Sequence, residues 1–265
     1  MPLYGKRYSI VLVNFRSRRI TAICLELIRT NVDLAEVDVL VVDNDSADDS
    51  VPYLRGIEWI RLIERKVDGP EQGFEAHGRA LDLALGHVRT GPMVLFHTDT
   101  FLYDRAVIET MLGRLSVGVA AVGTTEQVKR PWYSTAWRVA RRGTRYLWQC
   151  GMLGLGLREL AHRPWRESHL KSFCSVWDTA IIRREGLQFS MGILNPGYVM
   201  QDELESRGYQ FVRLSPGWVF RHLDHMQSGT VVEMGRHVGN PRRTAQYEKL
   251  LARFDAKATE RVERT

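Results

Sequence analysis

Short hydrophobic runs alternate with helical hydrophobic spacings along the first part of the chain. Runs of β-branched and other apolar residues are typical of buried strands, and they occur at 8–14, 37–42, 57–63 and 93–96. Apolar residues at spacings of three and four predict helices at 16–30 and 73–88, with a shorter helix before Gly56. This alternation of strand and helix predicts an α/β domain with a mostly parallel sheet.

The pattern is less regular in the rest of the chain. We expect strands at 117–122 and 172–182, and a polar segment at 242–264 that is helical in part. Segment 129–148 mixes aromatic with basic residues and has no acidic residue from Lys129 to Arg145. Such a segment can bind a polyanion or lie at a lipid headgroup layer, or it can be a solvated helix whose aromatic side chains pack inward.

Polar side chains cluster where the predicted strands end, at Asn14, at Asp43 with Asp45, and at His97 with Asp99. Ligands of parallel sheets bind at the carboxyl ends of strands, so these clusters are expected to share one site. His97 and Asp99 are two residues apart and would share a face of an extended strand. The sequence therefore predicts a site for a divalent metal and a diphosphate; the alternative is a local turn in which Asp99 bonds the backbone.

Two glycine-rich phosphate motifs are absent from the sequence. No Gly-x-Gly-x-x-Gly follows the first strand, and no Gly-x-x-x-x-Gly-Lys-Ser/Thr occurs anywhere. A nucleotide bound at the strand ends would therefore be held by carboxylates and a metal rather than by a glycine loop.

The ordered series of strand ends resembles the signatures of family 2 glycosyltransferases. The matching segments are 9–15, 41–50, 73–74 and 94–100. The resemblance implies an α/β GT-A fold, a Rossmann-like and mostly parallel sheet flanked by helices in a single domain. It further implies a nucleotide-sugar-binding half at 1–125, a half that binds the acceptor and carries the catalytic base at 126–240, and a C-terminal tail at 241–265.

The same resemblance implies a donor site assembled from successive strand ends. It would bind the base, ribose and diphosphate of a nucleotide-diphosphate sugar through Asn14, Phe15, Asp43, Asp45, Asp68, Gly73, Arg79, Thr98 and Asp99.

His97-Thr98-Asp99 occupies the position of the family's Asp-x-Asp metal motif, with histidine in place of the first carboxylate. The resemblance makes Asp99 the principal ligand of Mg²⁺ or Mn²⁺ and makes His97 a candidate ligand. A later motif, a strand at 218–220 followed by histidines, offers His222 and His225 as further candidates.

The family's catalytic base lies in an acidic pair that opens a short helix ending in Gly-Tyr. Asp202 is the candidate base here, with Glu203 next, ahead of Gly208-Tyr209. The reaction implied is transfer of a sugar to a hydroxyl acceptor with inversion, the base accepting the hydroxyl proton. The alternative is an N-capping role for Asp202.

Composition narrows the context of this reading. The net charge of +6 and a pI near 9.4 suit anionic partners. The three dispersed cysteines, and the lack of a signal-like or membrane-spanning run, favour reduced thiols in a cytoplasmic protein. Segment 129–148 could bring this protein into peripheral contact with a membrane or polyanion. Two rival hypotheses remain: a sugar nucleotidyltransferase, and a nucleic-acid- or lipid-binding module with a degenerate active site.

Overall fold

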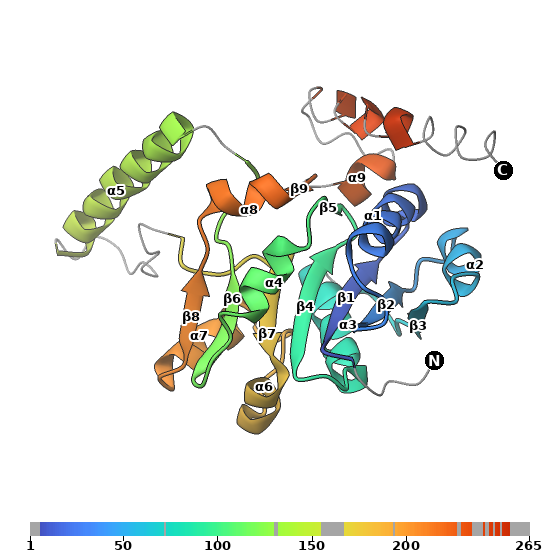
Figure 1. The fold of residues 1–265 in the computed structure, drawn as a ribbon. Coiled ribbons are helices and arrows are strands. Elements are labelled where there is room, and N and C mark those ends of the chain that lie inside the picture. The colour runs from blue at the N-terminus through green and yellow to red at the C-terminus, as the bar shows by residue number, and fades with distance from the viewer. Residues whose placement is uncertain are drawn as a thin grey trace.

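A mixed seven-stranded sheet forms the centre of the protein, with strand order β3-β2-β1-β4-β7-β6-β8 (Figure 1). The structure, a computed structural model, describes residues 6–71, 73–129, 132–154, 167–192, 194–226 and 229–234, with 241, 244–245, 247–249 and 251–254 beyond them. Helices cover both faces of the sheet, which confirms the predicted α/β architecture.

The first half of the chain builds the parallel part of the sheet. Its elements are β1 (Tyr8–Asn14), α1 (Arg18–Asn31), β2 (Val37–Asn44), α2 (Ser50–Arg55), β3 (Ile60–Arg65), α3 (Gly73–His87) and β4 (Pro92–His97). β1 pairs in parallel with β2 and β4, and β2 with β3. The registers align Asn14 with Asp43 and Val13 with His97, so the polar ends of β1, β2 and β4 lie at one edge of the sheet.

The second half adds three strands to this sheet, two strands of a second sheet, and further helices. Its elements are β5 (Thr100–Leu102), α4 (Ala106–Leu112), β6 (Val119–Gly123), α5 (Trp132–Gly154), β7 (Cys174–Asp178), α6 (Thr179–Glu185), α7 (Tyr198–Ser206), β8 (Gln210–Arg213), α8 (Pro216–His222), β9 (Leu223–His225) and α9 (Gly229–Glu233). β7 runs antiparallel to both β4 and β6, whereas β8 is parallel to β6.

One predicted strand in this half was too long, and another was wrong. The strand expected at 172–182 ends at Asp178, whose Oδ1 accepts hydrogen bonds from the backbone N–H groups of Ala180 (2.9 Å) and Ile181 (3.3 Å) and so starts α6. The strand expected at 218–220 is part of α8, which has Pro216 in its first turn, where the missing N–H costs no hydrogen bond.

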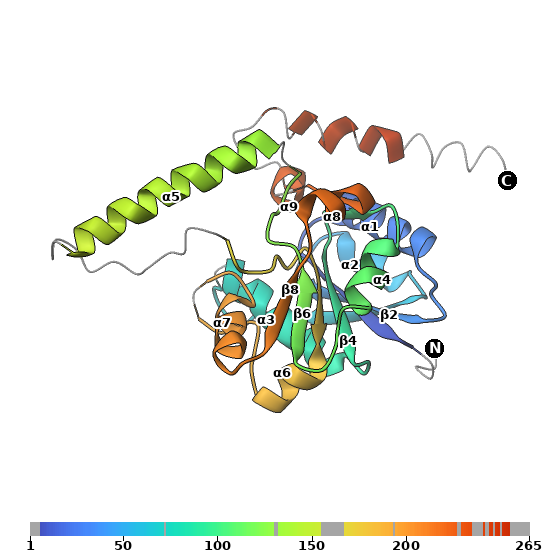
Figure 2. The same cartoon turned by 60° about the vertical axis from the view of Figure 1, so that its left-hand side comes forward.

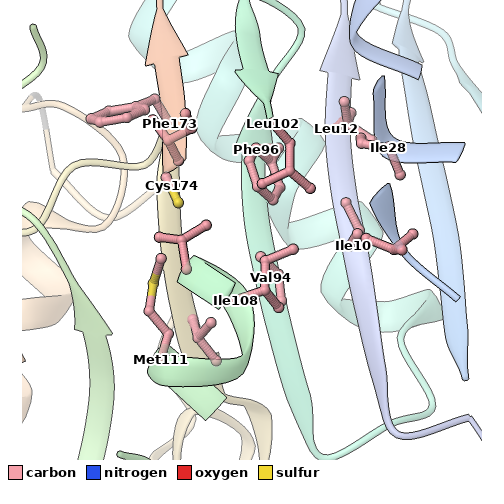
Figure 3. Close-up of a cluster of buried hydrophobic side chains, with 14 of the residues drawn as sticks. Ile10, Leu12, Ile28, Val94, Phe96, Leu102, Ile108, Met111, Phe173 and Cys174 are labelled. Carbon is pink, nitrogen blue, oxygen red and sulfur yellow. The ribbon is translucent and has the colours of Figure 1, made fainter. Parts of the chain in front are cut away.

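Alternate residues of the central strands pack on opposite faces of the sheet. Figure 3 shows one face, where Leu12 of β1 lies beside Ile28 of α1, and Val94 and Phe96 of β4 lie beside Ile108 of α4 and Leu102 of β5. The other face of these strands packs against α3, α6 and α7. Burial on both faces explains why the strands read as continuous apolar runs rather than alternating ones.

A second, two-stranded sheet connects the end of β4 to a distant part of the chain. β5 and β9 pair antiparallel, with Thr100 opposite His225, and the backbone N–H of Met226 donates to the carbonyl of Asp99 over 2.9 Å. This pairing fixes residues 223–226 beside the segment that follows β4.

Helix α5 projects away from the sheet in both views (Figures 1 and 2). Arg138 near its start pairs with Glu126 (2.7 Å). Large apolar side chains along it are exposed, among them Trp137 (70%), Leu147 (70%) and Trp148 (58%). The predicted alternative, in which the aromatic side chains pack inward, is therefore wrong for Trp137 and Trp148.

The state of the cysteines and the hydropathy of the helices bear on the predicted cellular context. Cys24, Cys150 and Cys174 are all free thiols. Among the described residues, none of the helices combines the length and hydropathy that crossing a membrane would need.

The cap at Asp178 gives a first prediction. Replacing Asp178 by Ala should lower the free energy of unfolding by about 1 kcal/mol, because the first N–H groups of α6 lose their acceptor. Urea denaturation measures this change. Asp178→Asn is the matched control, since an amide oxygen caps a helix nearly as well; equal losses in both variants would contradict the capping role.

Candidate active site

A cavity of about 680 Å³ lies at the edge where β1, β2 and β4 end. The first half of the chain lines it with residues at or just after the ends of these strands, among them Phe15, Arg16, Asn44, Asp45, His97, Thr98 and Asp99. The second half contributes Gln127, Lys171, Ser172, Asn195, Tyr198 and His225. Both halves of the chain therefore build one site.

His97, Asp99 and His225 form a cluster of potential metal ligands within this cavity, their donor atoms all within 4.8 Å of one another. Asp99 Oδ1 lies 3.2 Å from His225 Nε2 and 3.9 Å from His97 Nδ1. The end of β4 supplies His97, and the β5–β9 pairing supplies His225. The sequence-predicted residues are thus brought together from positions far apart in the chain.

Hydrogen bonds orient both imidazoles. His225 Nδ1 lies 2.7 Å from the carbonyl oxygen of Gln127, which can only accept, so we assign the proton to Nδ1. Nε2 of the same ring lies 3.2 Å from Asp99 Oδ1, a contact in which a proton or a metal ion has to lie between the nitrogen and the carboxylate oxygen. His97 Nε2 is likewise engaged by Ser172 Oγ at 2.9 Å. Outer hydrogen bonds of this kind are typical of metal-binding histidines, so the residues fit a divalent cation.

The protonation states agree with this fit. Burial lowers the pKa of His97 to about 3 and that of His77, which also lines the cavity, to about 4, so both rings are neutral at pH 7. Burial alone would raise the pKa of Asp99, but the neighbouring His225 and the backbone N–H of Gly229 outweigh it and hold that pKa below its ordinary value. Neutral imidazoles and a carboxylate are the forms that coordinate a metal.

Gly229 fixes the second oxygen of Asp99. Its backbone N–H donates to Asp99 Oδ2 over 2.9 Å. A Cβ at this position would lie 2.4 Å from Ile20 Cδ1 and 2.8 Å from Asp99 Cβ, so only glycine allows this approach. Sequence reasoning missed this role because the contact joins residues that are remote in sequence.

The donor candidates divide into two groups. Phe15, Asp45, Gly73, Thr98 and Asp99 line the cavity, whereas Asn14, Asp43, Asp68 and Arg79 do not.

Asn14 and Asp43 are buried beneath the cavity edge. Asn14 Nδ2 donates to Asp43 Oδ1 (2.8 Å), and the hydroxyl of Ser46 donates to the same oxygen (2.6 Å). They therefore hold the turn after β2 that presents Asp45. Arg79 is engaged by Glu75 (2.5 Å) and Glu71 (3.2 Å).

The acidic pair proposed for catalysis lies outside the cavity lining. Asp202 is in the middle of α7 rather than at its start, which excludes the N-cap alternative, and its side chain is 58% exposed. Its Oδ1 lies 2.7 Å from His169 Nε2, while the other ring nitrogen faces Glu167, and the two carboxylates raise the pKa of His169. Glu203 pairs with Arg207 at 2.7 Å.

Tyr198 at the start of α7 and His222 at the end of α8 differ in whether they belong to the site. Tyr198, in the first turn of α7, lines the cavity, and the ammonium of Lys171 donates to its hydroxyl. His222 is not part of the metal-ligand cluster, because its Nδ1 lies 2.8 Å from Asp104 Oδ2.

Comparison with known proteins identifies the architecture. The sequence matches no family model and no curated protein. The structure is similar to the mannosyltransferase PcManGT from Pyrobaculum calidifontis, solved in complex with GDP-Man and Mn²⁺ (TM-score 0.57, 16% identity, 94% of this chain and 71% of that one). It is also similar to residues 1–349 of TarS from S. aureus (TM-score 0.50, 12% identity, 94% of this chain and 70% of that one). The chain therefore has the GT-A fold of glycosyltransferases that its sequence resemblance implies.

Proposed function

We propose that this protein transfers a sugar from a nucleotide-diphosphate sugar to a hydroxyl acceptor. The observation that supports this best is the His97–Asp99–His225 cluster in a cavity at the strand ends of a GT-A fold. The P. calidifontis mannosyltransferase was solved with GDP-Man and Mn²⁺, which makes a nucleotide sugar and a divalent cation the expected ligands here.

The cavity suits a nucleotide sugar in size and in the distribution of its polar groups. Its volume of about 680 Å³ is within the usual range for small-molecule sites. The donor base or ribose would contact Phe15 and Asp45, and the diphosphate would lie at Thr98 and Asp99. The guanidinium of Arg16 lies 5.1 Å from the Phe15 ring centroid and lines the same cavity, so it can favour an anionic ligand.

The reaction is an inverting displacement at the anomeric carbon. The acceptor oxygen loses its hydroxyl proton to a base or to water and forms a bond to that carbon, while the bond to the diphosphate oxygen breaks and a nucleoside diphosphate is released. Asp99, His97 and His225 would hold Mg²⁺ or Mn²⁺, which neutralises charge on the departing diphosphate. Lys171 and Tyr198 line the part of the cavity built by the second half of the chain, and we assign them to acceptor contact.

Donor binding gives the central prediction. A nucleotide sugar together with Mn²⁺ should raise the melting temperature of the protein, since binding to the folded state stabilises it. Asp99→Asn should abolish this shift and transfer, whereas the exposed Glu58→Gln should retain both. A thermal-shift screen followed by product analysis measures this.

The products also test the rivals. Release of pyrophosphate instead of nucleoside diphosphate would identify a nucleotidyltransferase. The absence of any stabilising donor would contradict the proposal.

The base assignment is tested at Asp202. Because this carboxylate is exposed, ion-paired with His169 and outside the cavity lining, Asp202→Asn is expected to lower turnover less than about tenfold. Loss of a general base costs about 10²–10⁴ in rate. Steady-state turnover of Asp202→Asn beside Glu203→Gln measures this; a loss in the larger range for Asp202→Asn would restore it as the base.

We further propose that α5 lies on an anionic membrane surface. Trp137 and Trp148 are eleven positions apart, about three helical turns, so they share a face. Arg141 and Arg145 lie along one side of that face, are both exposed and have no ion pair within the described residues. A helix with exposed tryptophans beside arginines binds at the headgroup layer. Exposed Leu147 favours lipid over nucleic acid, since an aliphatic side chain adds nothing to base stacking.

Vesicle sedimentation tests the role of α5. The protein should bind vesicles containing phosphatidylglycerol, less so at high salt, and not vesicles of phosphatidylcholine alone. Trp137→Ala with Trp148→Ala should weaken binding, while Val117→Ala, an exposed apolar control outside α5, should not. Binding to DNA that equals or exceeds vesicle binding would overturn the assignment.

A further inference from the structure

The cation site of this protein is richer in nitrogen than an Asp-x-Asp site. We propose that it selects first-row transition-metal ions such as Co²⁺ and Zn²⁺ against Mg²⁺, and that His77 is a fourth protein ligand. The inference deepens the proposed function, on which it rests for the purpose of the ion. Metal binding itself can be measured without any nucleotide sugar.

The set of donor atoms is the first argument. His97 Nδ1 and His225 Nε2 supply two nitrogens against the Asp99 carboxylate. Mg²⁺ prefers oxygen ligands and keeps much of its water shell, whereas imidazole suits Co²⁺, Ni²⁺ and Zn²⁺. Replacing a carboxylate by His97 therefore moves the site away from Mg²⁺.

Preorganisation of the two rings is the second argument. The Gln127 carbonyl and the Ser172 hydroxyl each engage the ring nitrogen that faces away from Asp99. The Phe173 ring also stacks on His225, with centroids 4.3 Å apart and planes 13° from parallel. The nitrogens are therefore aimed at the carboxylate before any ion binds, which lowers the entropy lost on coordination.

His77 provides the third argument. It lies on α3, lines the same cavity, and its ring centroid is 5.2 Å from that of His97 at an angle of 85°. Its Nε2 is buried without a hydrogen-bond partner among the described residues. Buried polar atoms without partners are rare, and coordination of an ion held beside the neighbouring His97 would give this nitrogen a partner.

The backbone of α3 approaches its neighbour closely beside His77. A Cβ built on Gly78 would lie 2.7 Å from the Cα of Ser190, so this glycine allows the helix to pack directly on that loop. His77 is therefore carried by a rigidly packed element rather than by a free loop, as a ligand requires.

Metal titration of the chelator-treated, full-length protein tests the selectivity. Co²⁺ should bind one ion per chain with a visible absorption spectrum, and about 100-fold or more Mg²⁺ than Co²⁺ should be needed to compete. Zn²⁺ should displace Co²⁺. Competition by Mg²⁺ at concentrations comparable to Co²⁺, or no Co²⁺ binding, would overturn the proposal.

Three variants separate the ligands from the scaffold. His77→Gln should weaken Co²⁺ binding about tenfold or more and change its spectrum, whereas His87→Gln on the same helix should do neither. His97→Asp should tighten Mg²⁺ binding and narrow the Co²⁺ preference. Metal-free melting curves check folding, with His77→Asn as a second substitution. Unchanged Co²⁺ affinity and spectrum in folded His77 variants would remove His77 from the ligand set.

The two proposals fail in different ways. Strong Co²⁺ preference without binding of any nucleotide sugar would overturn the glycosyl-transfer proposal and support the metal assignment. Donor binding and transfer that proceed equally well with Mg²⁺ and Co²⁺ would overturn the selectivity and support the transferase.

Discussion

Burial of the Asp99 carboxylate is the constraint on which the site depends. An isolated carboxylate in a protein interior costs several kcal/mol, so it must be compensated by hydrogen bonds and positive charge. Here the backbone N–H of Gly229 supplies a hydrogen bond to Oδ2, and His225 Nε2 faces Oδ1, where a proton or a metal ion between the two atoms supplies positive charge. Both residues follow β8 and α8 in the chain. The carboxylate of the first half therefore requires the second half to close over the end of β4.

Strand direction explains how the other partners reach the same point. Because β7 is antiparallel to β4, with Phe96 opposite Cys174, the start of β7 lies beside the end of β4. Ser172, just before β7, thereby reaches His97. If β7 were parallel to β4, its C-terminal end would lie beside the end of β4 instead. The antiparallel direction of β7 thus adds the polar residues that precede it to the edge at which the parallel strands end.

The sequence predicts the parallel half of the fold because its information is local. Apolar runs buried on both faces define β1, β2 and β4, and their polar ends mark the cavity edge. The second half depends on contacts between remote residues. The end of the strand at Asp178 is set by its cap, and the choice of His225 over His222 is set by the β5–β9 register, which places His225 opposite Thr100.

The contacts of His77 with His97 and of Gly229 with Asp99 were not predicted for the same reason, since each joins residues that are remote in sequence. The acidic pair at 202–203 shows a different limit of a local motif. The residue types match a catalytic element, but α7 begins four residues before Asp202, so its first turn presents Tyr198 to the cavity instead. A short motif gives residue identity without helical phase, and the phase decides which side chain faces the ligand.

Charge balance links the histidines to the proposed donor. His77 and His97 are neutral at pH 7, and an imidazole that coordinates a metal is neutral. Asp99 is therefore the one charged side chain among these proposed ligands of the ion. A divalent ion there would keep about one positive charge, whereas two carboxylates would cancel it. In a cavity of low dielectric that residual charge attracts a diphosphate more strongly than a neutral site could. With His97 in place of a second carboxylate, the protein neutralises less of the ion's charge, and the diphosphate of the donor neutralises the rest.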